Sequence, residues 1–445
     1  MDYVPHTPEE VGAMLDTLGL ASLEELFRDI PERFRLKRLL ELPPPLTEQE
    51  TAVMMKGLGE ENRVPRMTLM GAGAYDHYIP SVVRHVISRS EFYTAYTPYQ
   101  AEISQGILQA LYEYQSMIEG LTGMAVANAS MYDGASALAE AAVLAARSLN
   151  RGRIAVAGTV HPQYRKVLGT YAWANNLDVV EIPYVETGRV DLGALEDLVD
   201  GGTAAVVVQN PNFFGVVENF APVAALAHGK GALAIAGFTD ATSLGLFAPP
   251  GALGADMAAG EGQAFGNPLN FGGPYLGILA ASAPFLRKIP GRIAGATVDK
   301  EGNRGFVLTL QTREQHIRRE KATSNICSNE SLCALAAAVY LAAVGKNLKG
   351  LAALNARKAA FFRENLSGVS GFGFPFSGPV YNEFVLKCPD PGSINKALEQ
   401  EGIVGGYLLE KDYPELSGTL LLCATETLSR SDIERAVSII RRAAG

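Results

Sequence analysis

The chain has 445 residues, and because a domain usually takes about 100 to 200 residues, about two or three domains with buried cores are expected. Hydrophobic residues make up 48% and charged residues 19% of the sequence, a balance that excludes disordered, collagen-like and low-complexity proteins. The 47 acidic and 38 basic residues give a net charge of −9, which argues against nucleic acid as the main ligand.

No segment has the sequence features of a membrane span or a secretory signal. The longest apolar stretches, such as 334–344, are shorter than the about 20 residues that cross a bilayer. The first residues lack a basic region followed by an apolar run, so we expect a cytoplasmic protein. The histidines are scattered and the cysteines form no Cys-x-x-Cys pair, which predicts no metal site and no disulfide framework. The cysteines are Cys327, Cys333, Cys388 and Cys423.

The first 65 residues predict an amino-terminal helical arm. A capping box places Glu three positions after Ser or Thr, so that each side chain accepts a hydrogen bond from the other residue's amide. Three such pairs occur, and we expect a short helix after each. The pairs are Thr7 with Glu10, Ser22 with Glu25, and Thr47 with Glu50.

Residues 66–325 predict a large α/β domain. Apolar residues at helical spacing over 103–121 indicate a long amphipathic helix that packs on a sheet. Short apolar runs then alternate with helix-length segments, a pattern typical of a mostly parallel, doubly wound sheet. The runs are IAVAG (154–158), VVEIP (179–183), AVVVQN (205–210) and LAIAGF (233–238), and the intervening helices are expected at 162–175, 191–199 and 222–228.

The pattern changes after Gly254. The runs 255–260 and 275–282 are joined by a glycine-rich loop without a helix, so an antiparallel strand is expected to close the sheet. Residues 326–445 predict a smaller α+β domain. Its elements are a helix at 348–366, strands at 380–388 and 419–425, and a last helix capped by Ser429 with Asp432.

A large doubly wound domain joined to a small α+β domain is typical of pyridoxal phosphate enzymes, which need a phosphate site and a carboxylate facing the pyridine nitrogen. The run NASMYDGAS (128–136) precedes a helix whose first amides could bind phosphate, with Ser130, Asp133 and Gly134 as candidates. A plain helix cap by Asp133 is an equal alternative. Asp240, at the end of a predicted strand, is placed to face the pyridine nitrogen.

The lysine amine that holds this cofactor covalently is missing. Between Lys230 and Lys288 the sequence has no lysine, although the cofactor-bearing loop should lie there.

Four long runs carry a family resemblance. They are GAGAYDHYIP (71–80), YTAYTPYQAEISQG (93–106), NASMYDGASALAEA (128–141) and QTREQHIRREKATSNICSN (311–329). In these runs the chain closely resembles the P-protein of the glycine cleavage system, with a match over essentially its whole length, and it looks like the amino-terminal, or α, subunit of the two-subunit form. The resemblance implies a fold type I, aspartate aminotransferase-like architecture.

The resemblance also accounts for the missing lysine. Family halves that hold pyridoxal phosphate have a His-Lys-Thr-Phe segment, and the aligned stretch here is Gly262-Gln263-Ala264-Phe265. Gln263 stands at the lysine position, and its amide cannot form the covalent bond. The resemblance therefore implies a degenerate cofactor site in this chain, with pyridoxal phosphate bound by the partner β subunit and none held covalently here.

The segment 93–100 carries more polar groups than a core segment can satisfy. By resemblance, it reaches into the pocket of the β subunit. A buried aromatic loop that holds the arm is the alternative. The residues expected to contribute to the partner's site are Tyr93, Tyr96, Thr97, Tyr99 and Gln100.

The run 313–321 alternates basic and acidic residues, which favours an exposed helix face or a salt-bridge network between domains. In the functional alternative, Arg313 or His316 helps to hold a carboxylate or the lipoyl-bearing protein.

The resemblance implies that the chain is a subunit of glycine decarboxylase and is inactive alone. In that reaction glycine and an oxidised lipoyl protein, the H-protein, give aminomethyl-lipoyl protein and CO2. The expected assembly is a heterotetramer of two α and two β subunits. Two alternatives stay open: a self-sufficient pyridoxal phosphate decarboxylase that uses another lysine, and a purely structural partner of the catalytic subunit.

Overall fold

The structure is a computed structural model in which the chain forms two compact units, 1–64 and 65–445, described here one at a time. It describes residues 5–95, 98–311, 315–322, 324–326 and 329–444, with only the backbone at 316 and 444.

In its described residues, 5–64, the first unit contains two α-helices, α1 (Pro8–Leu18) and α2 (Glu48–Glu60), and two 3₁₀ turns. The capping boxes predicted at Thr7 and Thr47 are confirmed, with both reciprocal hydrogen bonds present at each helix start. The box predicted at Ser22 is wrong, because the 3₁₀ turn η1 (Leu23–Phe27) follows it without a side-chain cap. In this tighter turn the Glu25 amide donates to the Ser22 backbone carbonyl at 3.2 Å instead of to the hydroxyl.

The second unit is built on a seven-stranded main sheet, with strand order β2-β8-β7-β6-β5-β3-β4. The four strands predicted from apolar runs are confirmed and pair in parallel. β7 continues the parallel order beside β6, and β8 runs antiparallel to β7, as predicted. The strands are β2 (Val126–Ala127), β3 (Arg153–Ala157), β4 (Asp178–Ile182), β5 (Thr203–Gln209), β6 (Leu233–Phe238), β7 (Met257–Glu261) and β8 (Gly277–Ala281).

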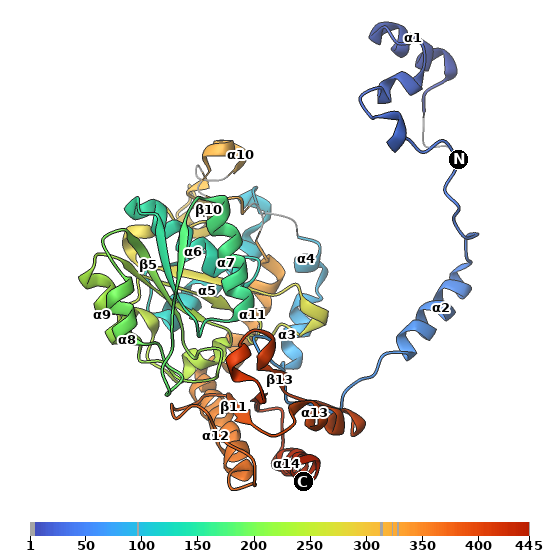
Figure 1. The fold of residues 1–445 in the computed structure, drawn as a ribbon. Helices are drawn as coiled ribbons and strands as arrows, with labels where there is room; N and C mark the ends of the chain where they lie inside the picture. Colours follow the sequence, from blue (N-terminus) through green and yellow to red (C-terminus); the bar gives the residue numbers. More distant parts are fainter. Residues whose placement is uncertain (1–4, 96–97, 312–314, 323, 327–328, 445) are drawn as a thin grey trace. The chain divides into compact units, whose positions relative to one another are not determined.

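Helices cover both faces of the main sheet (Figure 1). α6 (Gly134–Leu149) packs against α7 (Pro162–Ala174), while α8 (Leu192–Leu198) packs against α9 (Phe220–Gly229). α7 begins at a proline, as predicted, but α9 begins two residues before its expected start at Pro222. The chain adds β4 on one side of β3 and then returns to add β5 on the other side. Because crossovers between parallel strands are right-handed, this reversal in strand order places α7 on one face of the main sheet, and α8 and α9 on the other. In such sheets, this reversal leaves a crevice at the carboxyl ends of the strands.

The long helix predicted over 103–121 is α5 (Gln105–Thr122). Ile103, expected on its apolar face, is wrongly assigned, since it lies in a 3₁₀ turn and is 77% exposed. α5 packs on α11 (Ser331–Val344), on β2, and on a hairpin of β9 (Ile293–Val298) and β10 (Arg304–Thr309) that the sequence analysis missed.

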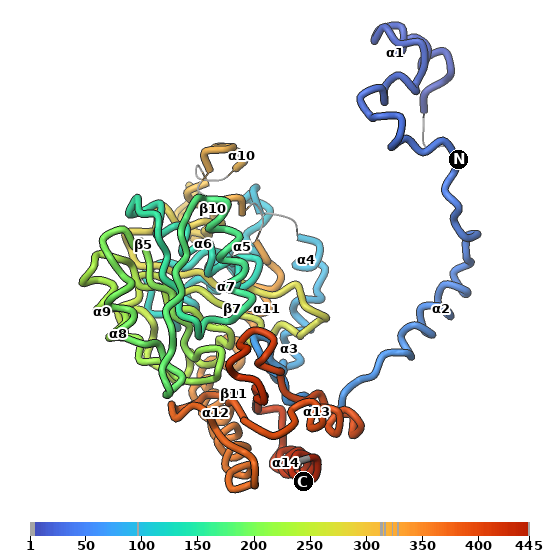
Figure 2. The backbone as a smooth tube through the Cα atoms, in the orientation of Figure 1, coloured from blue at the N-terminus to red at the C-terminus, as the bar shows by residue number. Residues whose placement is uncertain are grey.

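The carboxyl-terminal elements form a second hydrophobic core around a three-stranded small sheet, β11-β14-β13. β11 is shorter than the strand predicted at 380–388, and β14 begins at the predicted residue but ends two residues early. The last helix begins after the Ser429–Asp432 cap, and α12 matches the predicted range. Figure 2 shows β1 beside this part, where it pairs with β12. The division at 325/326 stays a prediction. The elements are β1 (Met67–Thr68), β11 (Glu383–Lys387), β12 (Ile403–Val404), β13 (Tyr407–Leu408), β14 (Thr419–Cys423), α12 (Leu348–Leu366), α13 (Pro391–Gln400) and α14 (Arg430–Ala444).

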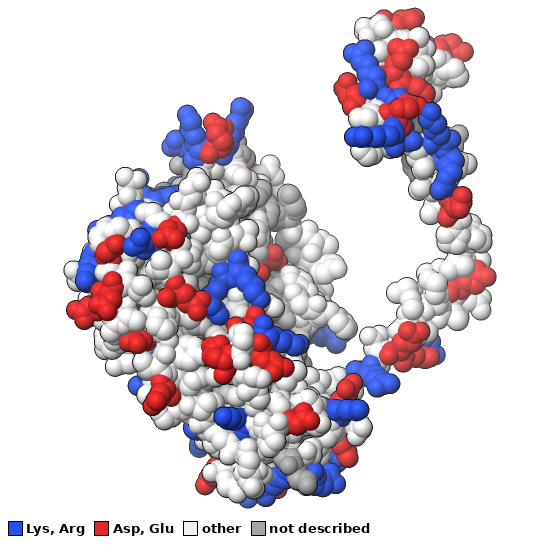
Figure 3. Space-filling model, in the orientation of Figure 1, with Lys and Arg blue, Asp and Glu red and all other residues white. Residues whose placement is uncertain are grey.

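One helical stretch, Ser331–Leu366, is long and apolar enough to cross a membrane by length and composition. It is interrupted by the 3₁₀ turn η10 (Gly345–Asn347), and α11 and α12 each contribute buried residues to a hydrophobic core. These features are typical of core helices in a soluble protein. Over the visible face of 65–445, acidic and basic side chains are interspersed (Figure 3).

Cys388 and Cys423 are buried and Cys333 is half-buried, all as free thiols, while Cys327 lies outside the described residues. Within the described part of the chain, no group of three His, Cys, Asp or Glu side chains could hold a metal ion.

Candidate functional site

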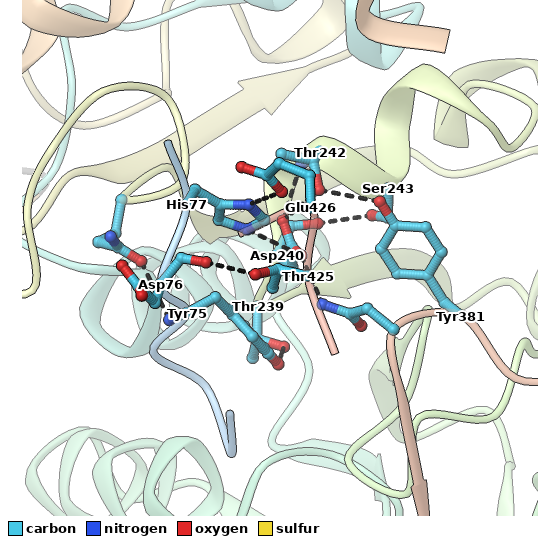
Figure 4. A network of polar contacts seen from close by, with 12 residues as sticks. Tyr75, Asp76, His77, Thr239, Asp240, Thr242, Ser243, Tyr381, Thr425 and Glu426 are labelled. Carbon is cyan, nitrogen blue, oxygen red and sulfur yellow. Dashed lines mark hydrogen bonds and ion pairs between the residues drawn. The ribbon is translucent and has the colours of Figure 1, made fainter. Parts of the chain in front are cut away.

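The crevice at the carboxyl ends of the parallel strands contains a network of buried polar side chains (Figure 4). Asp240 follows β6, Glu261 ends β7, and Gln263 follows it two residues later. The residues 71–78, which we call the crevice segment, contact Asp240 and Gln263 directly. They are linked to Glu261 through Gln263, whose backbone amide donates to Glu261. Asp240 and Gln263 were predicted from the sequence, whereas the role of the crevice segment was not.

The carboxylate of Asp240 is fully engaged within the chain. It accepts hydrogen bonds from the Thr242 amide at 2.9 Å, from the Thr242 hydroxyl at 2.6 Å, and from Asn382 Nδ2 at 2.7 Å. His77 Nε2 lies 3.3 Å from its second oxygen. Burial raises the pKa of Asp240, but the charge of His77 and these hydrogen bonds outweigh it, so that the pKa is lowered.

His77 lies between two carboxylates. Its Nδ1 is 2.9 Å from Glu426 Oε2 and its Nε2 faces Asp240, while its side chain is 1% exposed. Burial lowers the pKa of His77, but the two carboxylates raise it to about 10. The imidazole is therefore charged at neutral pH, with both ring nitrogens donating. It joins the crevice segment to β6 and to the loop that follows β14.

Tyr75 makes a second connection of the same kind. Its hydroxyl donates to Glu383 Oε2 at 2.6 Å and lies 3.0 Å from the Thr239 hydroxyl. The other oxygen of Glu383 accepts from the Ala72 amide at 2.7 Å. Burial raises the pKa of Glu383 to about 7 against these two hydrogen bonds.

Gln263, at the expected lysine position, uses both ends of its amide. Its Oε1 accepts from the Tyr75 backbone amide at 3.2 Å, and its Nε2 donates to the Asn267 carbonyl at 2.7 Å. The side chain is 3% exposed. It therefore holds the crevice segment against the loop after β7.

The predicted phosphate cradle is already filled by carboxylates. Asp133 caps α6 by accepting from the Ser136 amide at 2.7 Å, which confirms the cap alternative. The Gly134 amide donates to Glu261 Oε2 at 2.9 Å, and Glu261 Oε1 accepts from the Gln263 and Leu276 amides at 2.9 Å each. Burial raises the pKa of Glu261 to about 8 against these three amides. The Ser130 hydroxyl, in turn, accepts from the Glu330 amide at 2.9 Å.

These residues do not fit pyridoxal phosphate. The carboxylate that would face the pyridine nitrogen is occupied by His77 and Asn382, and two amides at the helix start, those of Gly134 and Ser136, already have carboxylate acceptors. A phosphate beside Glu261 and Asp133 would meet like charge wherever those carboxylates are ionised.

In the described part of the segment 93–100, Pro98 is buried and the other residues are exposed. Tyr93, which ends α4 (Ser90–Tyr93), is 69% exposed and Tyr99 is 44% exposed, which disagrees with a buried aromatic loop. Arg292 Nη2 donates to the Tyr99 hydroxyl at 2.9 Å. Tyr99 and Gln100 line a cavity of about 650 Å³. Tyr96 and Thr97 lie outside the described residues.

Arg313 also lies outside the described residues, and only the backbone of His316 is described, in α10 (Gln315–Arg318). The network residues that the sequence analysis missed include His77 and Glu261. A usable signal existed for both, because an ionisable residue inside an otherwise apolar or glycine-rich run requires buried partners.

The crevice segment passes close to its neighbours at Gly73. Its φ of +97° is rarely adopted by other residues, and an added Cβ would lie 2.5 Å from His161 Nε2. We expect Gly73→Ala to lower the free energy of unfolding by about 2–4 kcal/mol. The control is Gly120→Ala on the exposed side of α5, where a Cβ has open space, and which should stabilise by about 0.5–1 kcal/mol. Chemical unfolding of both variants measures this. Equal effects would show that the segment is loosely packed.

The sheet order and the crevice define the class of protein. A sphingosine-1-phosphate lyase of Burkholderia pseudomallei matches with a TM-score of 0.66 and 15% identity, over 93% of this chain and 94% of that one, a likeness in fold alone. The chain has the fold of pyridoxal phosphate-dependent transferases of type I.

More similar proteins identify the family. The model of the glycine cleavage system P-protein matches residues 1–440. A probable glycine dehydrogenase (decarboxylating) subunit 1 of Carboxydothermus hydrogenoformans is 52% identical over 444 residues, 99% of each chain. The corresponding protein of Desulfitobacterium hafniense is 51% identical over 442 residues, 98% of this chain and 99% of that one. The crystal structure of a glycine decarboxylase (P-protein) of the glycine cleavage system, in inhibitor-bound form, matches with a TM-score of 0.87 and 43% identity over 100% of both chains. The chain belongs to the glycine cleavage system P-protein family.

Proposed function

We propose that the chain is subunit 1, the α subunit, of a cytoplasmic two-subunit glycine dehydrogenase (decarboxylating). The observation that carries this proposal is its full-length similarity to relatives named subunit 1, combined with a glutamine at the position where a cofactor-binding lysine is expected. In the proposed reaction glycine loses its carboxylate as CO2, and its aminomethyl group passes to the oxidised lipoyl arm of the H-protein.

The partner β subunit holds pyridoxal phosphate in this proposal, in a heterotetramer of two α and two β subunits. The segment 93–100 of this chain completes the partner's site with Tyr93, Tyr96, Thr97, Tyr99 and Gln100. The exposure of Tyr93 and Tyr99 supports this, since both side chains are available to a neighbouring subunit. Arg313 or His316 is proposed to hold a carboxylate or the H-protein.

The purified chain should acquire no label when it is reduced with borohydride in the presence of pyridoxal phosphate. Reduction fixes the cofactor on a lysine amine, and the side chain of Gln263 cannot react in this way. Peptide mass spectrometry measures the label, and the β subunit treated in the same way is the positive control. A single labelled lysine in a chain that also turns over glycine alone would instead establish the self-sufficient enzyme.

A further inference from the structure

The crevice of this chain holds a peptide in the place where its fold class holds a ligand. Four features bring the segment 71–78 into close contact with the strand ends. Gly71 and Gly73 have no room for a side chain, since an added Cβ would lie 2.4 Å from Glu383 Oε1 and 2.5 Å from His161 Nε2, respectively. His161 Nε2 also lies 2.8 Å from the Ala72 carbonyl, and Tyr75 is 2% exposed.

We infer that the crevice segment has taken the cofactor's place and serves as a structural joint that holds the main sheet and the small sheet closed on each other. The glutamine at the lysine position is then one of several changes by which the chain's own residues fill the place of the cofactor. This role concerns the chain's own crevice and does not depend on the reaction that the assembled enzyme carries out.

The first argument is that two buried side chains of the crevice segment, Tyr75 and His77, each bond to residues at both sheets. Tyr75 contacts Thr239 after β6 and Glu383 of β11, while His77 contacts Asp240 after β6 and Glu426 after β14. The backbone adds bonds on both sides, because the Tyr75 amide donates to Gln263 after β7, while the Tyr78 amide donates to Glu426 Oε1 at 2.7 Å and the Asp76 carbonyl accepts from the Thr425 hydroxyl at 2.6 Å. Opening the crevice for a ligand would break all of these hydrogen bonds.

The second argument is that the anion position is filled by the chain itself. Glu261 is 2% exposed and accepts three backbone hydrogen bonds, one of them from the first residue of α6. The carboxyl group of Glu261 thus takes the first amide of α6, and Asp133 takes the Ser136 amide, both of which could otherwise bind a phosphate at the start of this helix. An Ala at Gly134 would also meet the Tyr164 hydroxyl at 2.2 Å and the Glu261 amide at 2.7 Å, so the space around the helix start is closed.

Restoring the lysine should therefore not restore cofactor binding. We expect Gln263→Lys in the full chain, reduced with borohydride in the presence of pyridoxal phosphate, to show no more label at position 263 than the wild type. The β subunit serves as the positive control. Stoichiometric labelling of Lys at position 263 would overturn the inference, because it would show that the crevice admits the cofactor once an amine is present.

Two measurements on the wild-type chain keep the inference testable if this variant does not fold. Pyridoxamine phosphate needs no lysine amine, and calorimetry should detect no binding to the crevice. Hydrogen exchange should show the amides of Ala72 and Tyr75 protected to within about tenfold of those in β6, because both donate to buried side chains. Binding of pyridoxamine phosphate that is lost in Asp240→Ala, or rapid exchange of these two amides, would contradict the inference. Neither result would bear on whether the segment 93–100 serves the partner.

Discussion

Replacing Tyr96 with Phe, or Thr97 with Ala, in the assembled two-subunit enzyme should slow glycine decarboxylation by about 10- to 1000-fold. Each change removes one hydroxyl from the segment proposed to complete the partner's site, which corresponds to about 1.4–4 kcal/mol of lost transition-state stabilisation. Exchange of labelled bicarbonate into glycine measures the effect. Because a hydroxyl deletion removes little packing, thermal stability and assembly should change by only about 1 kcal/mol.

A matched control is Tyr184→Phe. The Tyr184 hydroxyl donates to Glu415 at 2.6 Å. Tyr184 follows β4, the edge strand of the main sheet at the end opposite to β2. Loss of this hydroxyl should leave the exchange rate unchanged. If the Tyr96 and Thr97 variants also exchange at the wild-type rate in an intact complex, the segment is structural and the chain is a purely structural partner.

The regular part of the fold could be predicted because its signals are local. A strand buried on both faces requires a continuous apolar run, and 233–238 matches β6 residue for residue. Thr7 with Glu10 and Thr47 with Glu50 mark helix starts because a capping box is completed within four residues. Ser22 has the same local pattern but fails, since a one-turn 3₁₀ segment satisfies the same amide through the backbone.

The network in the crevice could not be predicted in this way, because its partners are distant in the sequence. His77 is 163 residues from Asp240 and 349 from Glu426, and Glu261 reaches back 127 residues to Gly134. The sequence places Asp240 and Gln263 at strand ends, since parallel strands bring their carboxyl ends to one edge. It does not show which segment comes to lie against that edge. Only the tertiary structure reveals that a peptide from before the first main-sheet strand does so.

His77→Gln should destabilise the chain strongly. The two carboxylates that the imidazolium pairs with would remain buried without its charge, and breaking a buried ion pair from one side typically costs about 3–5 kcal/mol. The control is His228→Gln, because His228 Nε2 pairs with Asp256 at 2.9 Å but its side chain is 46% exposed. Loss of this exposed pair should cost at most about 1 kcal/mol.

The pH dependence of this difference tests its electrostatic origin. The pKa of His77 rises from 6.5 to about 10 on folding, so the folded state binds the additional proton between these values. Its contribution to stability is complete below the unfolded pKa and is lost as the pH rises through the folded one. The pKa values of Asp240 and Glu426 are lowered on folding, so their contribution is present above their unfolded pKa and is lost in acid.

The stability gap between the wild type and His77→Gln should therefore be widest near about pH 6, which is below the unfolded pKa of the imidazole and above those of the two carboxyl groups, and should close toward about pH 10. Thermal unfolding of both chains across this range measures the gap. A gap that stays constant from about pH 6 to pH 10 would show that His77 stabilises the crevice by packing and neutral hydrogen bonds alone. In that case, the crevice segment would be held in place chiefly by Tyr75 and its bond to the buried carboxyl of Glu383.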